Sequence, residues 1–203
     1  MKFILLNGRR YSGKDTVANL IEKWCKSRGL KTIFFALADE CKLDFARENG
    51  LDGGRMIHDR EYKEQYRLEL TDYYHEQLKK DKEIYEKIVS EKIKTLVEKE
   101  KNMVEKTKVD LVDLVVIKDA RTLYNLEFLS SHLAEFGSLA KIRIEVDDET
   151  RKQRGWKKSP YDDTHIETGA DGYMDWDFVI LNNTDCLELL RKDVENCLME
   201  FCK

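Results

Sequence analysis

Two glycines and a lysine near the start of the chain have the spacing of a phosphate-binding loop. Gly8 and Gly13 are separated by four residues and Lys14 follows directly, which gives the pattern G-x-x-x-x-G-K. The glycines let the backbone turn so that successive N–H groups point at phosphate oxygens, and the lysine ammonium reaches the β- and γ-phosphates. The predicted nucleotide-binding residues are Gly8, Arg9, Arg10, Tyr11, Ser12, Gly13, Lys14, Asp15 and Thr16.

The flanking sequence supports this interpretation, because it predicts a strand before the loop and a helix after it. The apolar run 3–6 precedes the loop, and an apolar stripe at Val17, Leu20, Ile21 and Trp24 follows it. A helix that begins at the loop adds its positive N-terminal end to the phosphate site. Chance matches to the glycine pattern rarely have both neighbours.

One position of the loop departs from the usual pattern and concerns the metal ion. Asp15 stands where serine or threonine normally offers a hydroxyl group to Mg²⁺, and Thr16 follows it. Either Asp15 binds the metal, directly or through water, or ligation moves to Thr16. The residues leave both alternatives open.

Phosphoryl transfer requires several cations around the moving group and a carboxylate for Mg²⁺. Asp119, at the end of an apolar run, is the natural carboxylate for the metal or for orienting the acceptor; its alternative role is a helix cap. Lys63 and Arg67 are four residues apart and suit the anionic group of a second substrate, although surface charges often show this spacing. The candidate cations nearer the chemistry are Arg9, Arg10, Lys14, Arg121, Arg151 and Arg154.

The segment from about 148 to 174 is predicted to be a basic lid. Arg151 and Arg154 are three residues apart, so one helical turn places both on the same face. A lid that closes such cations over the phosphates would exclude water during transfer. The alternative is a solvated basic surface helix.

The rest of the chain alternates between apolar runs and helical periods, which predicts an α/β fold. Parallel strands with helices on both faces make three layers, and ligands bind beyond the carboxyl ends of such strands. A loop is expected at 51–60, and a break near Lys80 and Asp81 in the long helical span. The predicted strands are 3–6, 32–37, 111–117, 141–146 and 178–181; the predicted helices are 14–27, about 41–46, 61–106 in two parts, about 126–133 and 185–203.

Composition restricts the class of protein. The 203 residues suit a single domain with a helical acceptor-binding region at about 51–106, and the net charge of −4 argues against a general nucleic-acid binder. No apolar run approaches the roughly 20 residues that cross a bilayer, and the first strand leaves no room for a signal peptide. Five cysteines without metal spacing indicate free thiols. We expect a cytoplasmic monomer that binds neither membrane nor nucleic acid.

These residues resemble the animal-type phosphomevalonate kinases, which belong with the nucleoside-monophosphate-kinase-like P-loop enzymes. The resemblance covers most of the chain, and its most specific part is Arg-x-x-Arg-Gly-Trp with two aspartates shortly after. The matching segments are 8–15, 62–67, 119–121, 151–156 and 162–163, together with Glu167, Asp171, Asp177 and Asn182.

The resemblance implies transfer of the γ-phosphoryl group of ATP to mevalonate 5-phosphate, for isoprenoid synthesis. Lys14 and Asp15 would serve ATP and Mg²⁺, and Asn182 would lie at the nucleotide. Lys63, Arg67 and Arg121 would hold the phosphate and carboxylate of the acceptor, with Asp119 beside them. Arg151 and Arg154 would be the lid cations that stabilise the transferred group.

Three departures from that family concern the acceptor. Tyr11 replaces a basic residue of the loop, Thr122 stands where a second arginine is usual, and 93–110 resembles an insertion, expected to lie outside the chemistry. A phage-type deoxynucleoside monophosphate kinase is the nearest alternative, through its similarity to segments 12–16 and 163–166. A third possibility is a non-catalytic P-loop nucleotide-binding protein.

Overall fold

The computed structural model describes residues 1–104 and 111–203, so the last part of the predicted insertion, 105–110, lies outside the described residues. The chain packs into two compact units. The sheet unit comprises residues 1–34 and 97–203, and the helical unit comprises residues 35–96. Among the described residues, no helix combines the length and the apolar character that crossing a bilayer requires.

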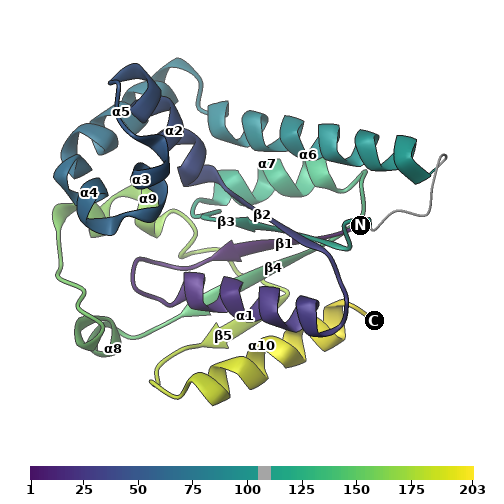
Figure 1. The fold of residues 1–203 in the computed structure, drawn as a ribbon. Helices are drawn as coiled ribbons and strands as arrows, with labels where there is room; N and C mark the ends of the chain where they lie inside the picture. Colours follow the sequence, from purple (N-terminus) through teal and green to yellow (C-terminus); the bar gives the residue numbers. More distant parts are fainter. Residues whose placement is uncertain (105–110) are drawn as a thin grey trace. The chain divides into compact units, whose positions relative to one another are not determined.

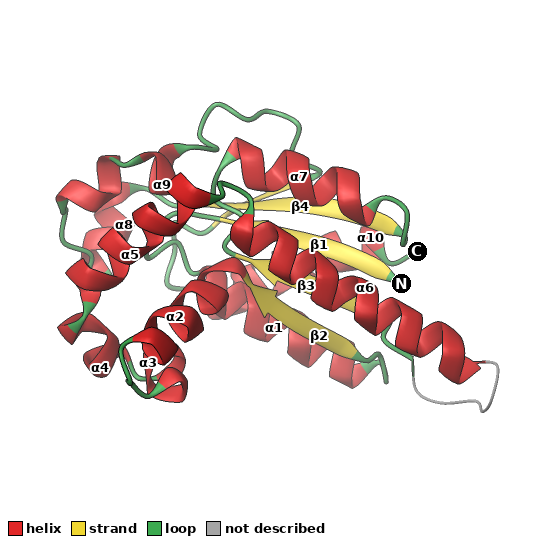
Figure 2. Cartoon of the chain, turned by 90° about the horizontal axis from the view of Figure 1, so that it is seen from above, coloured by secondary structure: helices red, strands yellow, loops and turns green. Residues whose placement is uncertain are grey.

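The sheet has five strands in the order β2-β3-β1-β4-β5 (Figures 1 and 2). β1 lies in the middle and pairs in parallel with β3 and β4, and β4 pairs in parallel with β5. Leu6 of β1 aligns with Lys118 of β3 and with Ile142 of β4, so the loops after β1 and β3 leave the same edge. The strands are β1 (Lys2–Asn7), β2 (Thr32–Ala36), β3 (Leu114–Lys118), β4 (Ser138–Glu145) and β5 (Phe178–Leu181).

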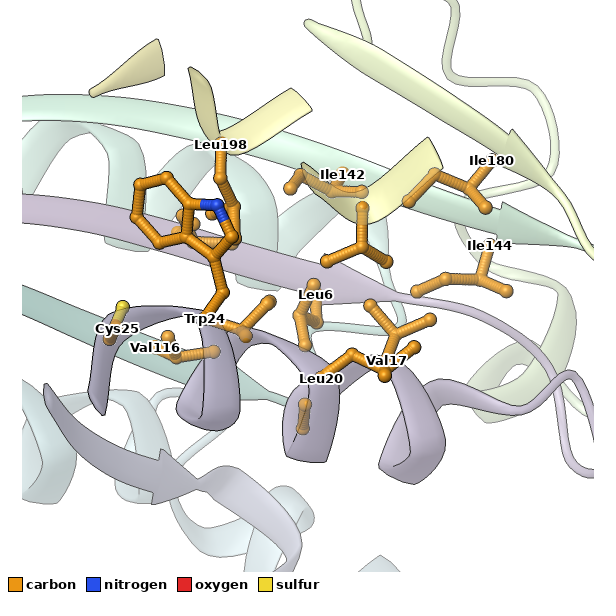
Figure 3. Close-up of a cluster of buried hydrophobic side chains, with 14 of the residues drawn as sticks. Leu6, Val17, Leu20, Trp24, Cys25, Val116, Ile142, Ile144, Ile180 and Leu198 are labelled. Carbon is orange, nitrogen blue, oxygen red and sulfur yellow. The ribbon is translucent and has the colours of Figure 1, made fainter. Parts of the chain in front are cut away.

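Helices cover both faces of this sheet, which confirms the predicted α/β class with three layers (Figure 1). The helices α1 (Lys14–Ser27) and α10 (Leu187–Phe201) cover one face, and α7 (Leu123–Leu133) covers the other. The predicted apolar stripe of α1 packs on the strands because its positions recur every three or four residues. Figure 3 shows this core, which contains Leu6, Val17, Leu20, Trp24, Cys25, Val116, Ile142, Ile144, Ile180 and Leu198.

The segment predicted as a lid lies between β4 and β5 and belongs to the sheet unit. It contains three short elements rather than one basic helix. These are α8 (Asp148–Gln153), the 3₁₀ turn η1 (Pro160–Asp163) and α9 (His165–Thr168). Asp147 caps α8 by accepting the N–H of Thr150, and Ser159 and Asp162 form a reciprocal cap on η1.

The helical unit is built from α2, α3, α4, α5 and the first part of α6. The predicted break near Lys80 and Asp81 is confirmed, since α5 ends at Lys80. α6 continues into the sheet unit from Val97 onward. The bounds are α2 (Leu37–Glu48), α3 (Gly53–His58), α4 (Arg60–Gln65), α5 (Arg67–Lys80) and α6 (Ile84–Val104).

The prediction of a loop at 51–60 was wrong, because the helix α3 occupies most of this segment. Asp52 caps the new helix by accepting the N–H of Arg55 at 2.9 Å, and Met56 is fully buried. A capping carboxylate and one buried side chain outweigh the low helix propensity of Gly53 and Gly54. All five cysteines are free as predicted, with Cys25 and Cys41 buried.

Candidate active site

The loop between β1 and α1 requires both of its glycines. Gly13 has φ 91°, a left-handed conformation, and ends the loop directly before the first residue of α1. A Cβ atom on Gly13 would overlap the side-chain amide of Asn182, and one on Gly8 would overlap Oγ of Ser12. Tyr11 also has a left-handed φ, 61°, which costs a residue with a side chain about 1 kcal/mol. The backbone is therefore held in the sharp turn that a phosphate site needs.

Lys14, the first residue of α1, forms an ion pair with Asp119 from the end of β3. Nζ of Lys14 lies 2.9 Å from Oδ1 of Asp119, and the two side chains are 8% and 14% exposed. Asp119 has φ 65°, so it too is left-handed. Thr122, not Asp119, caps α7, which excludes the alternative role of Asp119 as the cap of this helix. The structure therefore brings the predicted cation and the predicted carboxylate together.

Arg121 extends this charged group to the segment after β4. Its guanidinium lies 3.1 Å from Asp119 and also contacts Oε1 of Glu167 in α9. The other oxygen of Glu167 accepts the backbone N–H of Arg10 at 3.0 Å. One buried carboxylate thus joins the loop, the end of β3 and the predicted lid.

Arg154 lies beside the start of α1. Its Nη2 donates to the carbonyl oxygens of Asn182 and Thr184 at 3.0 and 3.1 Å. Its Nη1 is buried and lacks an acceptor among the described residues, and a Cβ atom on Gly13 would lie 3.9 Å from it. A buried guanidinium nitrogen without an acceptor is costly, and an anion at the helix start would satisfy it. Asn182 also donates to the carbonyl of Ser12 at 2.8 Å.

Arg151 has different surroundings, since its side chain is only 2% exposed. Its Nε donates to the carbonyl oxygen of Arg10 at 3.0 Å, and its two terminal nitrogens lie 2.8 Å from Asp148 and 3.5 Å from Asp162. The guanidinium also stacks 3.8 Å above the ring of Trp156. A solvated basic surface helix, the alternative for this segment, does not describe Arg151.

A second acidic residue of the segment, Asp171, holds Arg9 of the loop and lies 2.8 Å from Arg143 of β4. Partial burial would raise the pKa of Asp171, but hydrogen bonds from Arg9 and Arg143 hold it below its ordinary value. Arg143 also donates to the side chain of Asn7, at the end of β1. No role was predicted for Glu167 or Asp171 from the sequence, although both belong to the positions that resemble the phosphomevalonate kinases.

Two of the predicted Mg²⁺ ligands, Asp15 and Thr16, lie on the first turn of α1, and the third, Asp119, follows β3. Asp15 is 82% exposed, 3.8 Å from Lys118, and Thr16 is exposed next to it. The described part of the chain contains no group of three or more histidine, cysteine or acidic side chains arranged so that it could hold a metal ion. Mg²⁺ in kinases takes one or two protein ligands and completes its shell with phosphates and water, so this small donor set fits the ion.

The helical unit contains the other predicted acceptor residues. Arg67 forms an ion pair with Glu64. Lys63 is partly buried, and no ion pair within the described residues includes it. Burial, together with the nearby charges of Lys42 and Arg67, lowers the pKa of the Lys63 ammonium. A cation that is disfavoured in this way gains from binding an anion.

Comparison with known proteins assigns this chain to a family. The model of the family described as phosphomevalonate kinase matches residues 6–135, which include the loop and the end of β3. A Drosophila melanogaster protein named phosphomevalonate kinase is 24% identical over 190 residues, covering 93% of this chain and 91% of that protein.

Solved structures agree on the fold. The APS kinase CysC of Mycobacterium tuberculosis, solved in complex with AMPPNP and APS, aligns with a TM-score of 0.54 at 12% identity, over 98% of this chain and 97% of that one. The match to the family model extends over more than half of the chain. This chain therefore belongs to the phosphomevalonate kinase family, and is a kinase that binds a nucleotide and phosphorylates a small phosphorylated acceptor.

Proposed function

We propose that this kinase depends on ATP and Mg²⁺ and transfers the γ-phosphoryl group of ATP to the phosphate of mevalonate 5-phosphate, giving mevalonate 5-diphosphate. The observation that carries the proposal is the pair of cations at the start of α1. Lys14 is buried at the helix start, and Nη1 of Arg154 lies next to Gly13 with no acceptor in the described part of the chain. Phosphoryl transfer is catalysed by cations in such a position, because charge spreads over the moving group.

The loop residues from Gly8 to Thr16 are proposed to bind the phosphates of ATP. Their N–H groups and the positive end of α1 attract the phosphate oxygens. Lys14 exchanges Asp119 for the phosphates when the nucleotide binds, and Nη1 of Arg154 neutralises the group in transfer. Asn182 supports both, since it contacts Ser12 and Arg154.

Asp15 or Thr16, with Asp119, would hold Mg²⁺. The ion would supply positive charge to the phosphate oxygens during transfer. The chain's own contribution is a carboxylate and a hydroxyl group on the first turn of α1, next to the phosphate loop. This arrangement leaves most of the coordination shell of the ion to the nucleotide and to water.

Arg121 and Asp119 are proposed to face the acceptor from the end of β3, and Lys63 and Arg67 are proposed to bind its anionic groups. The ammonium of Lys63, which has no ion pair within the described residues, supports this role, because its lowered pKa is restored when a phosphate or carboxylate binds. Within one kinase domain, residues 51–106 would serve the acceptor and residues 148–174 would form the lid.

A nucleoside monophosphate is the second candidate for the acceptor, and Thr122 favours it. The phosphomevalonate kinases that this chain resembles usually have a second arginine here. In this chain Thr122 instead caps α7, accepting the N–H of Asn125 at 3.1 Å. Tyr11 likewise replaces a basic residue in the loop. This chain therefore has two fewer cations to bind an acceptor such as mevalonate 5-phosphate, which carries a carboxylate as well as a phosphate.

A coupled ADP-release assay distinguishes these acceptors. The purified protein is supplied with MgATP and either mevalonate 5-phosphate or a panel of nucleoside and deoxynucleoside monophosphates. We expect turnover with mevalonate 5-phosphate, and none for Lys14→Met prepared in parallel, which controls for contaminating kinases. Turnover with a nucleotide alone would overturn the acceptor but keep the kinase. No turnover with any acceptor, while ADP still binds, would favour a non-catalytic nucleotide-binding protein.

A further inference from the structure

The backbone of Arg10 is held at both of its polar groups, the N–H and the carbonyl oxygen, by the segment after β4. The N–H of Arg10 donates to Glu167 of α9 at 3.0 Å, and its carbonyl oxygen accepts from Nε of Arg151 in α8 at 3.0 Å. Both partners are charged and buried, at 8% and 2% exposure. Hydrogen bonds to charged groups contribute more than those between neutral ones.

The side chain of Arg10 is tied to the same segment. Its Nη1 donates to Oγ of Ser159 at 3.2 Å and lies 3.8 Å from Asp162. Asp162 in turn accepts from Trp156 at 3.0 Å and lies 3.5 Å from Arg151. One loop residue is thus fixed through its N–H, its carbonyl and its guanidinium, all by residues between β4 and β5.

The residue next along the chain explains why such fixing matters. Tyr11 has a left-handed φ of 61°, a conformation that a residue with a side chain adopts only when its surroundings enforce it. The loop must keep this turn if its N–H groups are to converge on phosphate oxygens. The restraint on Arg10 supplies what glycine would otherwise supply at this position.

Arg151 and Arg154 differ in how many of their guanidinium nitrogens already have a partner. The guanidinium of Arg151 is engaged at Nε and at both terminal nitrogens, and its face stacks on Trp156. Arg154 keeps one buried nitrogen next to Gly13 that has no acceptor among residues 1–104 and 111–203. The spacing of three residues therefore does not give both side chains the same task.

We propose that Arg151 and Glu167 are positioning residues, which hold the carbonyl oxygen and the N–H of Arg10 and thereby set the phosphate loop. Of the two arginines, Arg154 is then the one that touches the phosphates. The proposal rests on the function proposed above, in that the loop binds ATP. It divides the lid into a part that shapes the loop and a part that meets the reacting group.

The proposal predicts different losses for the two arginines. Removing a contact to Arg10 frees the loop, so ADP and ATP both bind less tightly, by about tenfold for a hydrogen bond to a charged group. Removing Arg154 leaves both backbone contacts of Arg10 in place, so we expect the ADP dissociation constant to change by less than about threefold. Its kcat should fall by at least about a hundredfold, since a transition-state contact is lost.

Hydrogen exchange of the loop amides, measured without nucleotide and by mass spectrometry, tests the positioning role directly. The variants are Arg151→Lys, Glu167→Ala, Glu167→Gln and, as a matched control in the same segment, Asp163→Asn, whose carboxylate is exposed and pairs with Lys158. ADP affinity is measured on the same samples. Exchange in peptides from β1 and β3 reports whether each variant is folded.

Arg151→Lys and Glu167→Ala should speed exchange of the loop by about tenfold and weaken ADP equally, with unchanged exchange in the strands. Glu167→Gln should recover much of the protection, because its amide oxygen still accepts the Arg10 N–H. Asp163→Asn should resemble the wild type.

Unchanged loop exchange in folded Arg151→Lys and Glu167→Ala would overturn the proposal, as would an Arg154→Ala variant that loses ADP affinity but keeps kcat. An acceptor other than mevalonate 5-phosphate would overturn the function proposed above and leave these measurements standing, because they need no acceptor.

Discussion

The ammonium of Lys14 and the carboxylate of Asp119 lie 2.9 Å apart at the carboxyl ends of neighbouring strands, and both are largely buried. The lysine that we propose to bind the nucleotide is therefore already paired with a carboxylate. On the proposed function, the phosphates of ATP would replace this anionic partner of Lys14. This exchange spares the folded protein an unpaired buried charge, which would cost several kcal/mol.

The first prediction concerns Asp119→Asn, a change that keeps the left-handed backbone, since asparagine tolerates it. Lys14 then lacks its countercharge, so the free energy of unfolding without nucleotide should fall by about 1–3 kcal/mol. Phosphates replace the missing carboxylate, so ADP should raise the melting temperature more in the variant than in the wild type. Differential scanning fluorimetry with and without ADP measures both effects.

If ADP stabilises Asp119→Asn no more than the wild type, Lys14 does not exchange partners as we infer. Asp119 is also proposed to bind Mg²⁺ or the acceptor, and the kinetic constants distinguish this role from its pairing with Lys14. That role predicts a loss of kcat of at least about tenfold that saturating ATP does not recover.

The second prediction concerns Lys14 itself. Lys14→Met keeps the length and apolar stem of the side chain, so the protein should fold, but turnover should fall by at least about a thousandfold. Lys26→Met on the same helix is the control, because Lys26 is 72% exposed and pairs only with Glu22 in the part of the chain described. Activity of folded Lys14→Met near that of Lys26→Met would refute the role of Lys14 in catalysis.

The sequence was sufficient to predict the loop, the sheet and the helix after the loop, because these depend on short-range rules. Gly13 has the positive φ that the glycine pattern requires, and α1 begins at Lys14 and ends at Ser27 as its apolar stripe predicted. The helix α3 was missed, since its start depends on one capping carboxylate, Asp52, and on the burial of Met56.

The roles of Glu167 and Asp171 could not be read from local pattern. Each contacts the loop from more than 150 residues further along the chain, and periodicity carries no information on such pairs. Arg151 and Arg154 show the same limit, because equal spacing on one turn did not reveal that one is enclosed by Trp156 and two carboxylates. Only the folded arrangement separates their surroundings.

The third prediction concerns the reactivity of Lys63. Its pKa is lowered by burial and by Lys42 and Arg67, so at a given pH a larger fraction of its amine is neutral and nucleophilic. Acetic anhydride at limiting concentration should therefore modify Lys63 faster than the exposed Lys80, as followed by mass spectrometry. Mevalonate 5-phosphate should slow the modification of Lys63 and leave Lys80 unaffected. Equal rates for both lysines, or no protection by the acceptor, would contradict an anion site at Lys63.

The fourth prediction concerns the dependence of stability on pH at Asp162, which is 5% exposed. Burial would raise its pKa, but hydrogen bonds from Trp156 and Ser159 hold the pKa of this carboxyl below its ordinary value. The unfolded chain has the ordinary value of about 3.9. The stabilisation is therefore fully present above about pH 4 and is lost as pH falls through the lower pKa of the folded state.

Asp162→Asn removes this charge with little change of shape, so it should lower the free energy of unfolding by about 1–3 kcal/mol at pH 7. The gap between wild type and variant should close as the pH is lowered below about 4, because the wild-type carboxylate is then protonated as well. Urea unfolding at pH 7, 5, 4 and 3 measures the gap, with Asp163→Asn, which alters an exposed carboxylate, as the control. A gap that stays constant down to pH 3 would mean that Trp156 and Ser159 bind Asp162 equally well in its protonated form, and the charge of this carboxyl would then add nothing to the enclosure of Arg151.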